Sequence, residues 1–366
     1  MDHDLRFAII GASASIVATH LDALRDLPGA TIVGMADIVA ARGAERAAAA
    51  GCPFFTDYRE MLDAIRPDVA VVCVPHPLHA SVSRDCIAVG CHVLSEKPVA
   101  IDVADADALI AAAAAAGKVV AVNFQQRFRP AIVYLKRLIE AGELGDLVRV
   151  LCVEPWYRTA FYYRTAPWRG SWAGEGGGVL MNQGPHPLDL LCHLVGSPAR
   201  VTGWTRTRAH AIECEDSAQA MLEYPNGAPG YIYFSTVEAG LHRRTEIVGD
   251  RAAVELVEDR LTIHRFAPPL SQHRAESQEM WGSPQVTSET IELASGDGGG
   301  HRAVYEDLIV ALHDGRRPRC DASDALMGLE LANAIIYSSQ IGAPVELPLD
   351  RAAYSAMLAR LRGATE

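Results

Sequence analysis

The feature that most constrains this chain is the alternation of short apolar runs with helical segments through its first third. Runs with the character of strands lie at 7–11, 31–36, 69–74, 92–95 and 119–123. The run Val69–Val74 is apolar at every position, which is typical of a strand buried on both faces. Segments with helical spacing or many alanines separate these runs, at 16–27, 39–50, 80–89 and 104–116. The alternation predicts an α/β fold with a doubly wound parallel sheet, which we place at residues 1–122.

The pattern changes after residue 123, and we place a second domain at 123–366. A helical segment at 129–141 and a strand at 148–155 lead into an aromatic stretch at 156–172, followed by a predicted helix at 179–194. Six strand-like runs then follow without intervening helices, at 201–207, 217–224, 230–236, 244–248, 252–257 and 260–264. Strands connected directly favour an open, mainly antiparallel sheet. We expect a long surface loop at 267–300 and helices at 301–314 and 322–340, which makes this an α+β domain.

Charge and cysteine content exclude several classes of protein. The chain has 45 acidic and 33 basic side chains, a formal net charge of −12, so we expect no nucleic-acid partner. No apolar stretch is long enough to cross a membrane, and the N-terminus lacks the basic and apolar regions of a secretory signal. The eight cysteines form no Cys-x-x-Cys pair and are expected to be buried free thiols. We therefore expect a cytoplasmic protein with no membrane partner.

Two pairs of histidines invite interpretation as metal ligands: His76 with His79, and His186 with His193. Pro77 interrupts the first pair, and seven residues separate the members of the second. Neither pair has a carboxylate or a thiolate at a standard ligand spacing, so we expect no metal site.

The turn after the first strand has the character of a nucleotide-binding turn. It reads Gly11-Ala-Ser13-Ala-Ser15-Ile16, with only the first glycine of the G-x-G-x-x-G pattern. Glycines at this place let the backbone approach a pyrophosphate at a helix N-terminus. Asp37 follows the second strand, where an acid accepts hydrogen bonds from the adenosine ribose and repels a 2′-phosphate, which favours NAD over NADP. The alternative for Asp37 is a helix N-cap.

Two further motifs carry groups suited to proton handling. Lys97, in Ser95-Glu96-Lys97-Pro98, follows a predicted parallel strand, where its charge can stabilise a reacting oxygen; the alternative is a solvated lysine in a turn. In the segment 176–189, Asn182, His186 and Asp189 share one face if the segment is a continuous helix. His186 is the natural general acid or base of that face, and the alternative is a hydrogen-bonded histidine of the core.

These motifs, in this order and spacing, resemble the family named for glucose–fructose oxidoreductase, inositol dehydrogenase and MocA. The resemblance covers nearly the whole chain and lies in Phe7–Gly11, Asp37, Val72–His79, Glu96–Pro98, Asn123–Phe128, Trp168–Arg169, 176–189 and His301 to Leu349. It implies an N-terminal Rossmann domain and a C-terminal domain whose open sheet serves in oligomers. It also implies hydride transfer between NAD(P) and sugars, cyclitols or their derivatives.

The resemblance also implies roles for individual residues. The expected catalytic residues are Lys97, which bridges the reacting hydroxyl and the nicotinamide, His186 as acid or base, and Asn182. Many relatives have an aspartate at the position of Asn182, and an amide holds a hydroxyl without carrying negative charge. The residues expected to bind the cofactor are Gly11, Ser13, Ser15, Ile16, Asp37, Pro75, His76, His79, Glu96, Lys97, Trp168 and Arg169. The residues expected at the substrate are Lys97, Arg127, Tyr163, Trp172, Asn182 and His186.

Together these features predict an NAD-dependent dehydrogenase that acts on a CH–OH group of a sugar, cyclitol or glycoside, with NADP the less favoured cofactor. Two alternatives remain open. One is an enzyme that keeps NAD bound and oxidises its substrate transiently, to shuttle hydride or to permit elimination. The other is a non-catalytic sensor of NAD or sugar on the same fold. We also expect a homodimer or homotetramer formed through the C-terminal sheet, because open sheets tend to be covered by a partner.

Overall fold

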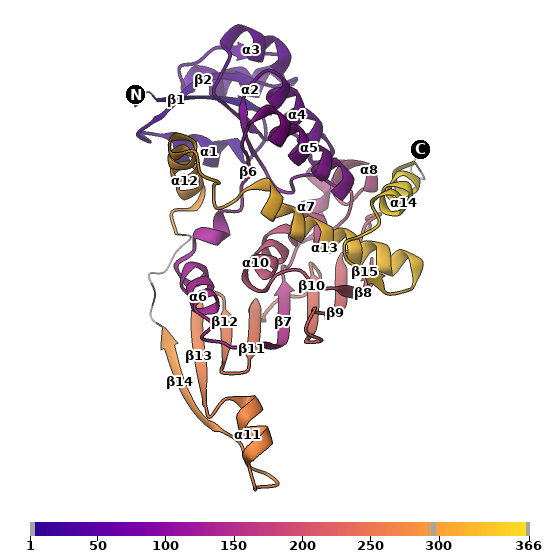
Figure 1. The fold of residues 1–366 in the computed structure, drawn as a ribbon. Coiled ribbons are helices and arrows are strands. Elements are labelled where there is room, and N and C mark those ends of the chain that lie inside the picture. Colours follow the sequence, from indigo (N-terminus) through magenta and orange to yellow (C-terminus); the bar gives the residue numbers. More distant parts are fainter. Residues whose placement is uncertain (1–3, 292, 294–297, 364–366) are drawn as a thin grey trace.

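The computed structural model describes residues 4–291, 293 and 298–363 and contains two sheets, one in each half of the chain (Figure 1). The first sheet has six strands in the order β3-β2-β1-β4-β5-β6, all paired in parallel. Its strands are β1 (Leu5–Ile10), β2 (Ala30–Ala36), β3 (Phe54–Phe55), β4 (Val69–Val72), β5 (His92–Ser95) and β6 (Val120–Val122). Its helices are α1 (Val17–Leu24), α2 (Ala40–Ala49), α3 (Tyr58–Ile65), α4 (His79–Ala88) and α5 (Val103–Ala116). The predicted doubly wound sheet is confirmed.

Local sequence explains where these elements begin and end. Every residue of β4 is buried, as its unbroken apolar run predicts. Helix α5 begins after Asp102, whose carboxylate accepts a hydrogen bond from the Ala104 N–H at 2.9 Å, and ends at Gly117 in the left-handed conformation. Such caps define helix ends that apolar spacing alone leaves uncertain.

The second sheet has nine strands in the order β14-β13-β12-β11-β7-β10-β9-β8-β15, and only the β7–β10 pair is parallel. Its strands are β7 (Leu147–Pro155), β8 (Arg200–Arg206), β9 (Ser217–Glu223), β10 (Pro229–Ser235), β11 (Arg244–Gly249), β12 (Ala252–Val257), β13 (Arg260–Ala267), β14 (Gln285–Ile291) and β15 (Val345–Glu346). The mainly antiparallel sheet is therefore confirmed.

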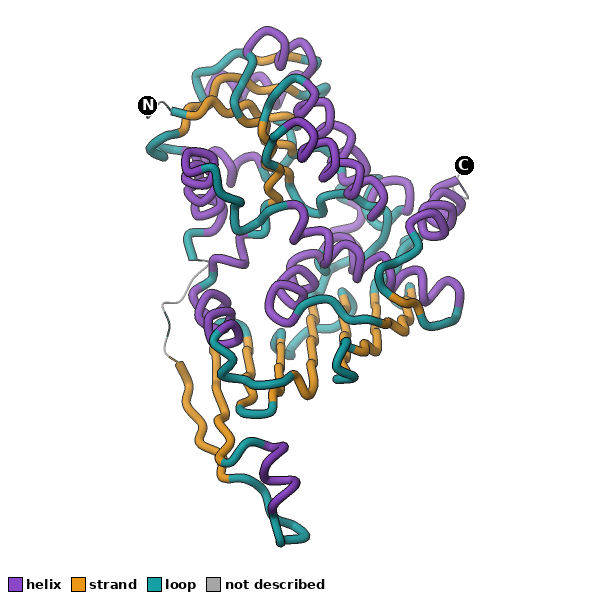
Figure 2. The backbone as a smooth tube through the Cα atoms, viewed as in Figure 1, coloured by secondary structure: helices purple, strands orange, loops and turns teal. Residues whose placement is uncertain are grey.

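Helices α6 (Pro130–Glu140), α10 (Pro185–Val195) and α13 (Ala322–Ile341) lie between this sheet and the N-terminal half (Figure 2). The remaining helices of the second half are α7 (Ala160–Arg164), α8 (Trp172–Glu175), α9 (Val179–Asn182), α11 (Leu270–Glu276), α12 (Gly300–Asp314) and α14 (Arg351–Gly363). Two short 3-10 turns complete the chain, His76–Leu78 and Gln125–Phe128.

Two expectations need correction, and one packing contact adds to the picture. The segment 267–300 is not a plain loop, because it contains α11 and β14, which project from the edge of the large sheet (Figure 1). The predicted helix at 179–194 is two helices, α9 and α10, separated at Gln183–Gly184. Helix α12 packs on the N-terminal sheet, where Tyr305 and Leu308 join the apolar cluster around Phe7, although it comes late in the chain.

Candidate active site

The candidate site lies at the carboxyl ends of β1, β4 and β5, where the strand order of the parallel sheet reverses between β1 and β4. Gly11 follows β1 with a φ of +90°, and a Cβ there would lie 2.5 Å from the Cys73 carbonyl oxygen. Only glycine fits at this position, because both the conformation and the approach exclude a side chain. The turn after β1 therefore packs tightly against the backbone that follows β4, and such a glycine turn is typical of a pyrophosphate site.

Asp37, directly after β2, closes this turn from the neighbouring strand. One carboxylate oxygen accepts hydrogen bonds from both the N–H and the hydroxyl of Ser13, each at 2.7 Å, and the other accepts from the Val39 N–H at 2.7 Å. Asp37 thus stands at the strand end where a ribose would lie, and it also binds the N–H of Val39, the residue just before α2. Ser13 orients this carboxylate, and Ser15 and Ile16 complete the turn before α1.

Lys97 lies beyond β5 and reaches toward the second half of the chain. Its ammonium donates a hydrogen bond of 2.9 Å to the backbone carbonyl of Asn182. Burial lowers the pKa of Lys97, and the negative charges of Glu96 and Glu175 oppose that shift. The structure therefore places the lysine of the Glu-Lys-Pro motif against the second motif, rather than in solvent.

His186 is the second residue of α10 and is 9% exposed. Burial lowers its pKa to about 3, and the charge of Lys97 acts in the same direction. The imidazole is therefore neutral near pH 7 and able to accept a proton. Its Nδ1 is buried and has no hydrogen-bond partner within the described part of the chain, and its ring packs edge-on against Phe124 with centroids 5.7 Å apart.

Asn182 ends α9 and connects Lys97 to a carboxylate that sequence reasoning missed. Its side-chain N–H donates to Glu175, which is 1% exposed and also accepts a 2.6 Å hydrogen bond from the Gly170 N–H. Burial raises the pKa of Glu175, and these hydrogen bonds with the charges of Arg169 and Lys97 oppose the rise. The available signal was an acid inside a run of glycines, Gly174-Glu175-Gly-Gly-Gly178.

Near Lys97, residues that follow β4 contact residues of the aromatic stretch. His76 and Trp168 lie with ring centroids 5.9 Å apart, and Arg169 stacks on Trp168 at 4.5 Å. The Nδ1 of His76 is buried without a partner among the described residues. His79, after Pro75, is held by the carbonyl oxygens of Val74 and Pro98, at 2.7 and 2.6 Å from its ring nitrogens. His79 therefore ties the two strand ends together.

Three residues expected at the substrate have other partners. The Arg127 guanidinium pairs with Asp189, with Nε 2.8 Å from the carboxylate, and it also donates to the Arg319 carbonyl. Both side chains of that pair are 1% exposed, so Asp189 does not share a face with Asn182 and His186. The Tyr163 hydroxyl lies 2.9 Å from the hydroxyl of Thr236, and Trp172 is buried in α8. The structure thus groups Lys97, Asn182 and His186 and leaves Arg127 outside that group.

A buried network supports Glu96 from behind. Glu96 accepts hydrogen bonds from His20, at 3.1 Å, and from Asn123, and His301 lies 3.7 Å away. His20 in turn lies 2.8 Å from the Tyr305 hydroxyl. Burial alone would raise the pKa of Glu96, but these polar neighbours hold it well below its usual range. We interpret this set as a hydrogen-bonded support that joins α1, β5 and α12.

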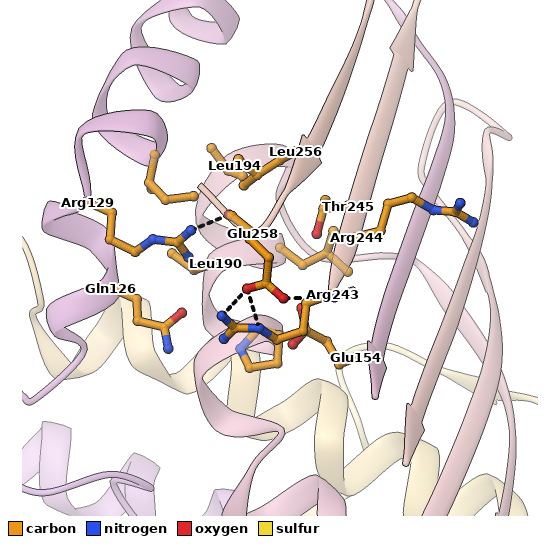
Figure 3. Close-up of a pocket in the computed structure, with 13 residues that line it drawn as sticks. Gln126, Arg129, Glu154, Leu190, Leu194, Arg243, Arg244, Thr245, Leu256 and Glu258 are labelled. Carbon is orange, nitrogen blue, oxygen red and sulfur yellow. Dashed lines mark hydrogen bonds and ion pairs between the residues drawn. The ribbon is translucent and has the colours of Figure 1, made fainter. Parts of the chain in front are cut away.

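A separate cleft lies beside α10 (Figure 3). Glu154 on β7 faces it, and burial raises the pKa of this carboxyl to about 7. Arg243 and Glu258, at the adjoining ends of β11 and β12, form an ion pair that lines the cleft, and Pro187, next to His186, also lines it. None of the helices in the described part of the chain has the length and apolar character needed to cross a bilayer.

Comparisons with known proteins match both halves of the chain. Residues 5–124 match the oxidoreductase family with an NAD-binding Rossmann fold, and 132–255 match the GFO/IDH/MocA C-terminal domain. D-apiose dehydrogenase of Paraburkholderia graminis is 28% identical, over 90% of this chain and 86% of that protein. Inositol 2-dehydrogenase 1 of Saccharopolyspora erythraea is 26% identical, over 87% of this chain and 97% of that protein.

Solved structures show the same fold. The WlbA dehydrogenase from Bordetella pertussis, in complex with NADH and UDP-GlcNAcA, is 28% identical with a TM-score of 0.81, over 95% of this chain and all of that one. Levoglucosan dehydrogenase in complex with NADH is 20% identical with a TM-score of 0.82, over 95% of this chain and all of that one. The two family models together span more than half of the chain. The chain therefore belongs to the glucose–fructose oxidoreductase, inositol dehydrogenase and MocA family of NAD-binding oxidoreductases.

Proposed function

We propose that this protein transfers hydride between NAD and a secondary alcohol or ketone of a sugar, cyclitol or glycoside. The observation that carries the proposal is the meeting of Lys97, Asn182 and His186 beyond the carboxyl end of β5, next to the Gly11 turn. A cation and a neutral imidazole in one buried site suit the removal of a proton from an alcohol.

The residues present fit NAD. Gly11 forms the tight turn after β1 where a pyrophosphate would lie, and Asp37 offers a carboxylate to the adenosine ribose. The Nδ1 of His76, which has no partner among the described residues, offers a polar contact beyond β4. When bound, NAD supplies the hydride acceptor or donor. The carboxylate of Asp37 opposes a 2′-phosphate, so we propose NAD rather than NADP as the working cofactor.

The side chains divide the proton chemistry between them. Lys97 donates a hydrogen bond to the reacting oxygen and stabilises the negative charge that develops there. His186 is neutral near pH 7, so a ring nitrogen accepts the hydroxyl proton during oxidation and returns it during reduction. Asn182 holds the hydroxyl through its amide. Trp168 and Arg169 wall the site on the side of His76.

The names of the relatives support the substrate class. The similar proteins include a D-apiose dehydrogenase, an inositol 2-dehydrogenase and a dehydrogenase crystallised with UDP-GlcNAcA. We propose a polyhydroxylated ring substrate, with aromatic side chains of the stretch 156–172 facing its C–H side.

The experiment is to measure formation of reduced nicotinamide with NAD, and separately with NADP, across monosaccharides, cyclitols and glycosides. Turnover with NAD supports the proposal, and Lys97→Met should lower it at least about a thousandfold while NAD binding remains. Lys118→Met, which changes a lysine outside the site, is the control. Binding of NAD without turnover of any compound would contradict the dehydrogenase. Cofactor retained through purification would instead favour transient oxidation on bound NAD.

We also propose roles for the two domains, an oligomeric state and a cellular compartment. Residues 1–122 bind the cofactor, and 123–366 supply substrate contacts and the contacts of a homodimer or homotetramer. All eight cysteines are unpaired in the structure, which supports a reducing compartment such as the cytoplasm.

A further inference from the structure

The site contains a carboxylate whose role the chemistry above leaves open. Glu175 is 1% exposed, with one oxygen on the side-chain N–H of Asn182 and the other on the Gly170 N–H. Asn182 in turn accepts the Lys97 ammonium through its backbone carbonyl, at 2.9 Å. Glu175 is thus one residue removed from the lysine, in a place where water does not screen its charge.

A buried carboxylate is costly to desolvate unless its surroundings compensate. Two neutral N–H donors compensate for part of that cost at Glu175. The positive charge nearby supplies a further reason to keep an acid here, because Lys97 and Arg169 both act on Glu175 through space. The hydrogen bonds to Gly170 and Asn182 could also be accepted by an uncharged amide, whereas the interaction with Lys97 and Arg169 requires a negative charge.

The charges around Lys97 are unbalanced without Glu175. Seven titratable groups interact electrostatically with Lys97. They are Glu96, Glu175, Arg158, Arg169, His76, His79 and His186. The two arginines disfavour a charged lysine, and the three histidines have lowered pKa values. Glu96 and Glu175 are the two acids that favour the charged lysine. Of the two, Glu175 is also linked to the lysine through Asn182.

We propose that Glu175 is a positioning residue for the reaction: its negative charge keeps Lys97 protonated, and its hydrogen bond fixes the Asn182 side chain beside the reacting hydroxyl. The inference rests on the proposed function for its link to turnover. One side-chain N–H of Asn182 binds Glu175, and its carbonyl oxygen accepts a 3.3 Å hydrogen bond from Gln183, which leaves that oxygen's second lone pair for the substrate hydroxyl. Glu175 thus supplies from seven residues upstream the negative charge that Asn182 lacks.

A lysine titration tests the first half of this inference without any substrate. The chain has three lysines, Lys97, Lys118 and Lys136, so protein labelled with ¹³C at lysine Cε gives three NMR signals that report ammonium deprotonation. Loss of one signal in Lys97→Met assigns Lys97. We expect Glu175→Gln to move the Lys97 midpoint to lower pH by about one unit, a tenfold loss of cation at a given pH, with Lys118 and Lys136 unchanged.

An exchange of acid and amide separates charge from hydrogen bonding. In Glu175→Gln/Asn182→Asp the amide at 175 still accepts from Gly170 and donates to the carboxylate at 182, so the network survives with its charge one residue closer to Lys97. We expect the Lys97 midpoint to return to the wild-type value or above it. Glu215→Gln is the matched control, because Glu215 is buried in the same region but bonds the backbone of α9 through Leu180.

Steady-state kinetics test the link between Glu175 and turnover. In Glu175→Gln the alkaline limb of the kcat/KM profile should move down in pH by the same amount as the Lys97 midpoint, and the exchange variant should restore it. An unmoved Lys97 midpoint in a folded Glu175→Gln protein overturns the inference. If that variant does not fold, a Lys97 midpoint about one unit below the wild-type value in the exchange variant overturns it equally. The NMR result stands even if no substrate is found, so failure here is distinct from failure of the proposed dehydrogenase.

Discussion

At the residue scale, the neutral state of His186 has a consequence for stability. Its pKa is lowered to about 3 in the folded chain, mainly by burial, against about 6.5 when unfolded. Between these values the unfolded chain binds a proton that the folded chain refuses. The contribution of His186 is therefore complete above pH 6.5 and is lost as the pH falls toward 3.

We expect His186→Gln to reduce the acid sensitivity of folding. The loss in unfolding free energy between pH 7 and pH 5 should be smaller than in the wild type by about 2 kcal/mol, since about 1.5 pH units of proton uptake are removed. Urea unfolding at the two pH values measures this difference. His242→Gln, at a histidine that is 74% exposed, should leave the loss unchanged. Equal acid sensitivity in wild type and His186→Gln would refute the neutral imidazole.

Asp37 carries the choice between the two cofactors. We expect Asp37→Ala to weaken NAD binding about tenfold or more, because the hydrogen bonds that the ribose hydroxyls donate to a charged carboxylate are lost. NADP binding should change less, since the repulsion of its 2′-phosphate disappears as well. Calorimetric titration with both cofactors measures the two affinities.

The control for this change is Asp57→Ala, which removes the aspartate that caps α3 through the Arg59 N–H at 2.8 Å. Each aspartate accepts a hydrogen bond from the backbone N–H two residues further on, just before or within the first turn of a helix. Both variants therefore lose one such bond, worth about 1 kcal/mol, and only Asp37 lies at the cofactor turn. Equal losses for NAD and NADP in Asp37→Ala would count against the ribose assignment.

At the element scale, the pair formed by Arg127 and Asp189 joins the turn after β6 to α10. Both side chains are buried, so removing one partner leaves an uncompensated charge. We expect Arg127→Met to lower the free energy of unfolding by about 3–5 kcal/mol, and Arg127→Met/Asp189→Leu to recover most of that loss. Urea unfolding of both variants tests this structural role. A KM that stays high in the stable double variant would show instead that Arg127 contacts substrate.

Elements with a clear apolar period could be predicted to within a few residues. Strand β9 alternates between buried Ala218, Ala220 and Leu222 and exposed neighbours, and it lies where the sequence pattern placed it. Strand β14 carries no such signal, because all but the last of its residues are exposed and it pairs only with β13. The segment 179–194 is predicted as one helix, although Pro185, which begins α10, and Pro187 already indicate a helix start or an irregularity there.

The candidate site was predictable where a motif follows a strand, and unpredictable where two loops meet. Lys97 and Asp37 follow β5 and β2 directly, so their positions come from the strand ends. The contact of Glu175 with Asn182 depends on how α8 and α9 fold back on each other. Part of that geometry comes from Gly178, where a Cβ would lie 1.8 Å from the Glu215 carbonyl oxygen. A close approach between two segments that are distant in the sequence produces no apolar periodicity from which it could be predicted.

At the scale of the whole molecule, the large sheet has one covered face and one open face. The covered face packs on α13 through Gly203 and Ala220, whereas Trp204 is 41% exposed and Met221 is 47% exposed on the other. The strand register places Met221 opposite Tyr231, so these apolar side chains lie next to one another. Exposed apolar patches on a sheet mark contacts with a partner, and a second copy of this chain is the occupant we propose.

We expect Trp204→Glu/Met221→Lys to reduce the mass in solution from a dimer or tetramer to the 39.3 kDa of one chain, because burying two charges at the interface is costly. Light scattering coupled to gel filtration measures the mass, and circular dichroism checks that the variant is folded. Trp281→Glu is the matched control, since Trp281 is 91% exposed and lies outside the sheet, between α11 and β14. A wild-type protein of single-chain mass, or a double variant that keeps its multimeric mass, would refute association through this face.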